Sequence, residues 1–166
     1  MKNMLSRVVF VVACTFAFTV NVAAAEKPEK LLTDQDLEMV RANARLDKAN
    51  VIKDYMQFNA TEAQAFWPIY DEYSAMYKVK IGDERVKLIS EYVKNRKKLT
   101  DELAKELVEK SLKLQNEKLD LQKKYYDKIV DAVGAKRAAE WFQINQYVDQ
   151  IYDLSISTKV PLARGK

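Results

Sequence analysis

The apolar positions from residue 34 onward recur at the three- and four-residue spacing of an α-helix. Thr33, followed three residues later by Asp36, is typical of a helix start, and we predict a first helix over residues 34–56. Its helically spaced apolar residues are Leu37, Val40, Ala44, Val51 and Tyr55. The pattern breaks at residues 57–60. No stretch of the chain shows a sustained two-residue alternation, so we predict no β-sheet.

A second and longer helical pattern covers residues 61–97. Thr61 and Gln64 have the spacing of a capping box, and we expect them to open this helix. Pro68 removes a backbone donor inside the pattern, and Gly82 lowers helix propensity near its midpoint. The sequence therefore predicts a bent helix rather than a straight one.

Two further helices follow. Thr100 is a good N-cap for a third helix that runs to Val133, and Gly134 is suited to a left-handed stop. The fourth helix is predicted over residues 135–154. Because the connection at residues 98–99 is short, the two long helices should lie antiparallel as a hairpin.

These elements predict an all-α fold: a long bent antiparallel helical hairpin with flanking N- and C-terminal helices, four in total. We expect residues 34–158 to form a single helical domain, after an N-terminal segment at 26–33 and before a tail at 159–166. The third helix has two apolar faces and must be covered from two sides. One cover is the second helix, and the other is the first helix, the fourth helix or a second subunit. The first face comprises Leu103, Leu107, Leu114, Leu121 and Tyr125, and the second comprises Leu112, Leu119, Tyr126, Val130 and Val133.

Residues 1–25 have the pattern of a cleaved secretory signal peptide. Basic residues at the start precede an apolar run at 8–20, and Ala23–Ala25 supplies the small side chains that a signal peptidase accepts. A lipoprotein anchored at Cys14 is the alternative. The apolar run before Cys14 is short and the residues after it remain apolar, which favours Cys14 as an ordinary part of the signal. We therefore predict export to the periplasm, with no integral membrane span after cleavage.

Composition removes several classes of chemistry. The chain of 166 residues carries a net charge of +4, has no histidine and has one cysteine, which lies within the predicted signal. Triads that use histidine, metal sites ligated by histidine and thiol nucleophiles are thereby excluded from the exported part. Lysines at helical spacing accompany the glutamates of the third helix, Glu102, Glu106, Glu109 and Glu117, which favours surface ion pairs over a metal site. We expect no catalytic residues, no cofactor, no metal and no enzymatic activity.

Two sets of residues on the second helix are candidates for protein binding. Phe66, Tyr70, Tyr73 and Tyr77 share one helical face. This face is either a core stripe or a partly exposed aromatic surface that holds unfolded or amphipathic partners. The basic candidates are Lys80, Arg85 and Lys87. They are either a solvated charged face or a means of steering acidic clients or an acidic sensor domain toward the protein. The predicted compartment argues against nucleic acid.

The start of the second helix resembles a known family. Thr61–Gln64 and the following Phe66–Tyr70 are similar to the helix-opening motif of the LTXXQ family, which includes Spy/CpxP-type periplasmic proteins. The resemblance is greatest to a proteobacterial branch with an F-W-P-x-Y segment, and it extends over about residues 37–163. The matching motif residues, expected to be structural, are Thr61, Gln64, Trp67, Pro68 and Thr100. The resemblance implies a bent helical hairpin that often forms a homodimer. It also implies ATP-independent chaperoning of unfolded envelope proteins, or restraint of a stress-sensing histidine kinase.

The leading hypothesis is therefore a periplasmic envelope-stress protein that binds unfolded or partner proteins in a chaperone-like way, without ATP. A regulatory partner of an envelope sensor of the histidine kinase type and a structural helical scaffold are the alternatives. A homodimer is the expected assembly.

Overall fold

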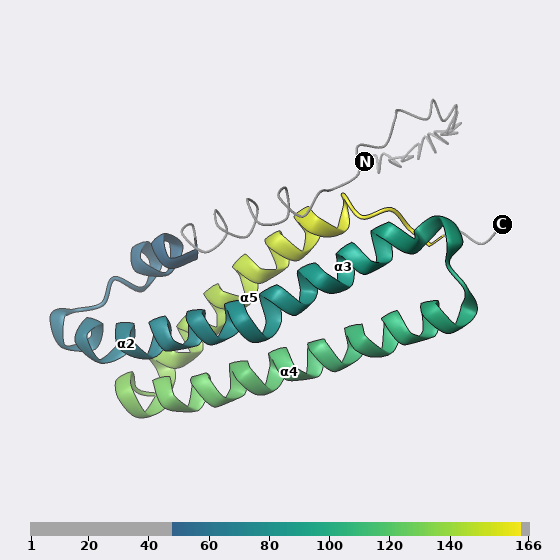
Figure 1. Cartoon of the computed structure of the whole chain (residues 1–166). Coiled ribbons are helices and arrows are strands. Elements are labelled where there is room, and N and C mark those ends of the chain that lie inside the picture. The colour runs from purple at the N-terminus through teal and green to yellow at the C-terminus, as the bar shows by residue number, and fades with distance from the viewer. Residues whose placement is uncertain (1–47, 164–166) are drawn as a thin grey trace, which may run out of the picture.

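The computed structural model describes residues 48–163, and this part of the chain consists of helices with no strand (Figure 1). A helical segment at residues 48–56 comes first. The following elements are α2 (Ala60–Tyr77), the π-helix η1 (Lys78–Gly82), α3 (Asp83–Asn95), the 3₁₀-helix η2 (Arg96–Lys98), α4 (Asp101–Val133) and α5 (Ala135–Ser157). The predicted all-α class and four helices are confirmed. The predicted signal peptide, the segment 26–33 and residues 34–47 of the first helix lie outside the described residues.

The predicted helix at 61–97 is a continuous run of α2, η1, α3 and η2. Pro68 lies inside α2, and the helix passes through it to Tyr77. The irregularity that we expected near Gly82 is a π-helix that ends at this residue, where the Asp83 N–H bonds to the Lys78 carbonyl. Such π-segments are commonly single-turn bulges within longer α-helices.

The cap of α2 differs from the sequence prediction. Asn59, in an extended conformation, is the N-cap, and its side chain accepts a hydrogen bond of 2.9 Å from the Glu62 N–H. Glu62 Oε2 in turn accepts a bond of 3.0 Å from the Asn59 N–H, which completes a capping box. The predicted box of Thr61 and Gln64 is therefore wrong, because Thr61 already lies inside the first turn. Asparagine is among the best N-cap residues, so it competes successfully with a nearby threonine.

The start of α4 and its end follow the prediction closely. Thr100 Oγ1 accepts a hydrogen bond of 3.3 Å from the Leu103 N–H at the start of α4. Gly134 has a φ of 84° at the other end, and its N–H bonds to the Val130 carbonyl at 2.9 Å. A side chain rarely adopts this backbone conformation, which explains glycine at this turn. Helix α5 continues beyond the predicted Leu154 to Ser157.

The helices α2 and α3 run antiparallel to α4, and α5 folds back from Gly134 to pack along α4 (Figure 1). The hydrophobic core lies where residues 48–56, α2, η1, the second half of α4 and α5 meet. No residue of α3 is buried, so the core occupies the end of the hairpin near Gly134. Among the helices of residues 48–163, none combines the length and apolar character needed to cross a membrane.

Candidate functional site

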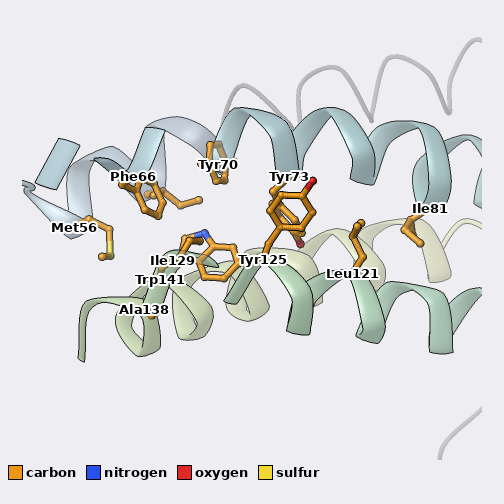
Figure 2. Close-up of a cluster of buried hydrophobic side chains, with 11 residues drawn as sticks. Met56, Phe66, Tyr70, Tyr73, Ile81, Leu121, Tyr125, Ile129, Ala138 and Trp141 are labelled. Atoms are coloured by element: carbon orange, nitrogen blue, oxygen red, sulfur yellow. The ribbon is translucent and has the colours of Figure 1, made fainter. Parts of the chain in front are cut away.

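The aromatic stripe of α2 faces the core. Phe66, Tyr70 and Tyr73 are buried, and Figure 2 shows Phe66 and Tyr73 extending from α2 toward α4 and α5. The Tyr73 ring lies 5.5 Å from the Trp141 ring of α5 in an edge-to-face arrangement, and 5.4 Å from the Tyr125 ring of α4. The interpretation as a core stripe is confirmed for these three residues. These three residues are therefore not part of an exposed surface, since residues 48–56, α4 and α5 contribute to the same buried cluster.

Tyr77, the fourth candidate in this stripe, lies at the edge of the core. It is half-buried, and its ring centroid is 5.8 Å from that of Tyr73. The ammonium group of Lys48 is 5.3 Å from the Tyr77 ring centroid and that of Lys118 is 5.9 Å away, within cation–π range. Burial, followed by the nearby Asp149 carboxylate, raises the pKa of the Tyr77 hydroxyl. This hydroxyl therefore stays protonated next to a group of charged side chains.

That group is centred on a buried ion pair. Lys48 Nζ lies 2.6 Å from Asp149 Oδ1, and the two residues are 101 positions apart in the chain. Gln122 donates a hydrogen bond of 3.3 Å to Asp149 Oδ2, and Lys118 Nζ is 3.3 Å from the same oxygen. Burial lowers the pKa of Lys48, while the Asp149 carboxylate opposes this effect. Asp149 thus joins residues 48–56, α4 and α5 at one point.

This pair was not among the predicted site residues, although the sequence carries a recognisable signal for it. Lys48 precedes the buried Ile52 and Met56 by four and eight positions, so it belongs to the apolar face of its helix. Asp149 follows the buried Asn145 by four positions on α5. A charged residue on an otherwise buried stripe indicates a buried partner, but the sequence does not specify which one.

The basic candidates of the second predicted helix separate into two kinds. Arg85 is half-buried and forms an ion pair with Asp153 of α5, which is also 3.5 Å from Lys118 Nζ. Lys80 and Lys87 are exposed, and Lys87 Nζ lies 2.7 Å from a carboxylate oxygen of its helical neighbour Glu84. Arg85 therefore connects α3 to α5, whereas Lys80 and Lys87 belong to the solvated surface.

Arg137 holds the connection between residues 48–56 and α2. It donates a hydrogen bond of 2.6 Å to the Met56 carbonyl and one of 3.0 Å to Glu62. It also bonds Glu140 at 2.6 Å, and its guanidinium lies 4.7 Å from the Phe58 ring centroid. The Asn59 backbone N–H and Arg137 together lower the pKa of the Glu62 carboxyl. The capping box of α2 is thereby anchored to α5.

The second apolar face of α4 is covered over only part of its length. Tyr126, Val130 and Val133 pack against the core, and the Tyr126 ring lies 5.9 Å from that of Phe142 in α5. Farther from Gly134, the face is open to solvent. The exposed residues here, which we call the α4 stripe, are Val108 (58% exposed), Leu112 (54%) and Leu119 (59%). Helix α5, which is the predicted fourth helix, therefore covers the second apolar face of α4, but only near Gly134.

A second exposed apolar row lies on α5. Tyr147, Ile151 and Leu154, called the α5 stripe below, fall within one sector of the helix and are exposed. The buried residues Trp141, Asn145 and Val148 lie on other positions of α5 and face the core.

An open groove of about 530 Å³ runs between α3 and α4 at the far end of the hairpin. Two leucines and six charged residues line it: Glu84, Lys87, Leu88, Glu91, Lys110, Lys113, Leu114 and Glu117. Because three carboxylates face three ammonium groups, and Lys110 pairs with Glu91 at 3.2 Å, the groove offers no excess charge to a ligand.

The carboxylates of α4 form ion pairs with lysines, as predicted for three of them. Lys110 lies 2.8 Å from Glu106, Lys113 3.8 Å from Glu117, and Lys105 3.9 Å from Glu109. Within residues 48–163, the structure brings together no group of three or more metal-binding side chains.

Comparison with known proteins gives no relative for this chain: no family model, no curated protein and no solved structure matches it.

Proposed function

We propose that this protein binds unfolded envelope proteins in an ATP-independent, chaperone-like way. The observation that carries the proposal is the exposure of two apolar stripes, one on α4 and one on α5, in a chain whose aromatic core is well packed. Exposed apolar rows bordered by charged residues are typical of surfaces that contact other proteins.

The α4 stripe is suited to weak capture of many sequences. Aliphatic side chains make contacts without directional requirements, so they accept any apolar segment of an unfolded client. Lysines and glutamates alternate around the stripe, among them Lys105, Glu109 and Lys113, and keep the surface soluble. Lys80 of η1 and Lys87 of α3 add positive charge, which raises the rate at which the protein encounters acidic clients. Release then follows from weak binding and from client folding.

The test measures aggregation of a chemically denatured enzyme by light scattering, with residues 26–166 and without ATP. We expect suppression near an equimolar ratio. The variant Leu112→Ser with Leu119→Ser removes exposed apolar area, and we expect it to lose most of the suppression with little change in folding stability. Gln115→Ser, at an exposed polar position of the same helix, is the matched control and should act like the wild-type chain.

Two results contradict the proposal. One is an absence of suppression with several unrelated clients, and the other is full activity of the double serine variant. If suppression is absent but cross-linking in the periplasm captures one envelope sensor, a regulatory partner of that sensor becomes the better description.

Periplasmic location and a homodimeric state complete the proposal. The first is supported by the signal pattern of residues 1–25, and the second by the exposed α5 stripe, which is separate from the α4 stripe that captures clients. Fractionation of cells that express the full chain checks the location. Light scattering during gel filtration of residues 26–166 checks the mass, and a monomer at all concentrations would contradict the dimer.

A further inference from the structure

Residues 48–56 lie with one face in a site formed by α2, α4 and α5. Lys48, Ile52 and Met56 follow one another at four-residue spacing, and their exposed fractions are 9%, 0% and 2%. The intervening Asn50, Lys53, Asp54 and Tyr55 face solvent. This is the arrangement by which an amphipathic helix docks in a groove, with its anchors on one side.

The site has a polar end and an apolar end. At the polar end, Asp149 receives Lys48, and the rings of Tyr73 and Tyr77 lie 5.9 and 5.3 Å from the Lys48 ammonium group. Toward the apolar end, Ile52 and Met56 join the cluster that contains Phe66 and Trp141. Figure 2 shows Met56 beside these two aromatic residues. The ion pair favours one register of the helix, because only in that register does the Lys48 ammonium group reach Asp149 Oδ1.

Both polar anchors keep partners when residues 48–56 leave. Asp149 retains the hydrogen bond from Gln122 and the ion pair with Lys118. Arg137, which loses the Met56 carbonyl, retains Glu62 and Glu140. When residues 48–56 leave, every buried charge of the groove therefore keeps a partner, and the Lys48 ammonium group becomes hydrated. Aromatic and aliphatic side chains of the core then face the vacated site.

We propose that this site is a helix-binding groove for a partner protein, and that residues 48–56 are its intramolecular competitor. The partner is an amphipathic helix with a lysine or arginine four positions before one bulky aliphatic residue and eight positions before another. This inference goes beyond the proposed function, since the groove is separate from the α4 and α5 stripes and selects by register rather than by general apolar character.

The probe is a fluorescent peptide with the sequence of residues 48–58, and the protein is residues 26–166. We expect weak binding to the wild-type chain, because the groove is filled. Ile52→Ala in the protein weakens the competitor, and anisotropy should then show binding about tenfold tighter or more.

The peptide itself supplies a matched pair of controls. Replacing the lysine that corresponds to Lys48 by alanine should reduce binding at least about tenfold, whereas replacing the exposed Lys53 should leave binding unchanged. Equal binding of the two altered peptides overturns the proposal, as does the absence of binding to an Ile52→Ala chain that retains its helical content.

If Ile52→Ala does not fold, hydrogen exchange of the wild-type chain decides the question. Excess peptide should speed the exchange of amides in residues 48–56 while α4 and α5 stay protected, and unchanged exchange contradicts the groove. If the protein forms a dimer and Lys48→Ala abolishes it, the groove binds a second copy of the chain. That result would overturn the assignment of the groove to a partner protein. The two proposals can fail separately. If the protein does not protect clients but still binds the peptide, the proposed function is wrong and the helix-binding groove is not contradicted.

Discussion

Asp149 shows how one residue organises several helices. Its carboxylate lies within 3.3 Å of side-chain atoms from residues 48–56 and from two positions of α4. Removing one member of a buried ion pair is costly because the remaining charges lose their counter-ion. Here the remaining charges would be the ammonium groups of Lys48 and Lys118, of which only Lys118 keeps an ion pair, at 3.5 Å from Asp153.

We therefore predict that Asp149→Asn lowers the free energy of unfolding by about 3 kcal/mol. Urea unfolding followed by circular dichroism measures this change. Asp120→Asn, at an exposed position of α4, is the matched control and should change stability by less than about 0.5 kcal/mol. If Asp149→Asn is as harmless as the control, the pair contributes nothing to stability.

Tyr125 makes stability sensitive to alkaline pH. Burial and the Glu72 carboxylate raise the pKa of its hydroxyl to about 12, whereas an unfolded tyrosine ionises near pH 10. As the pH rises from 10 toward 12, the unfolded chain loses this proton first, so the free energy of unfolding must fall.

The prediction is that the stability of Tyr125→Phe falls less steeply than that of the wild-type chain over this range. Urea unfolding at a series of pH values measures the difference, and Tyr55→Phe, at an exposed position, should follow the wild-type curve. Lys48, whose pKa is lowered, acts in the opposite direction, but equally in all three proteins. Parallel curves for Tyr125→Phe and the wild-type chain would contradict the prediction.

At the scale of the elements, the start of α2 combines local and tertiary interactions. The reciprocal bonds of Asn59 and Glu62 cap the helix, and Arg137 of α5 holds the same Glu62 side chain. Because Arg137 also donates a hydrogen bond to the Met56 carbonyl, it links the cap to the end of residues 48–56.

The capping box gives a prediction that separates two neighbouring residues. Asn59→Ala should lower the free energy of unfolding by about 1 kcal/mol, because the Glu62 N–H loses its acceptor. Thr61→Ala should change it by less than about 0.5 kcal/mol, since Thr61 is exposed and lies inside the helix. Thermal and urea unfolding of the two variants make the comparison. If Thr61→Ala lowers the free energy of unfolding more than Asn59→Ala does, Thr61 and not Asn59 is the capping residue.

On the scale of the whole molecule, buried side chains are concentrated at one end of the hairpin. Four of the five buried residues of α4 come after residue 120: Leu121, Gln122, Tyr125 and Ile129. The fifth, Leu107, lies in the first part of the helix. At the far end, Leu107 is accompanied by ion pairs such as that of Lys110 with Glu91 and by the hydrogen bond of 2.7 Å from the Tyr92 hydroxyl to the Pro161 carbonyl.

Hydrogen exchange should show this gradient along a single helix. We predict that amides at residues 121–131 exchange about tenfold more slowly, or slower still, than those at 105–117, because opening near the core exposes more buried surface. Mass spectrometry of overlapping peptides measures both regions in one experiment. Equal protection along α4 would mean that the whole hairpin opens only as one unit.

Much of the architecture could be predicted because it depends on local chemistry. Helical periodicity, the Thr100 cap and the need for positive φ at Gly134 act over a few residues, and the structure agrees with each. The cap of α2 was misplaced by two positions because two capping residues compete over a short distance, and the geometry of the whole turn selects Asn59.

The sequence by itself determined the helices, their order, their approximate ends and the two apolar faces of α4. It placed Tyr55 on the apolar face of the first helix, whereas Tyr55 is 75% exposed and Ile52 and Met56 form the buried face. Only the tertiary structure decided which faces are covered, because burial depends on contacts between segments far apart in the chain. Phe66, Tyr70 and Tyr73 became core, while Leu112 and Leu119, equally apolar, stayed exposed. The pairing of Lys48 with Asp149 has the same origin: each helix places its charge on a buried face, but only the packing of the helices makes the two charges meet.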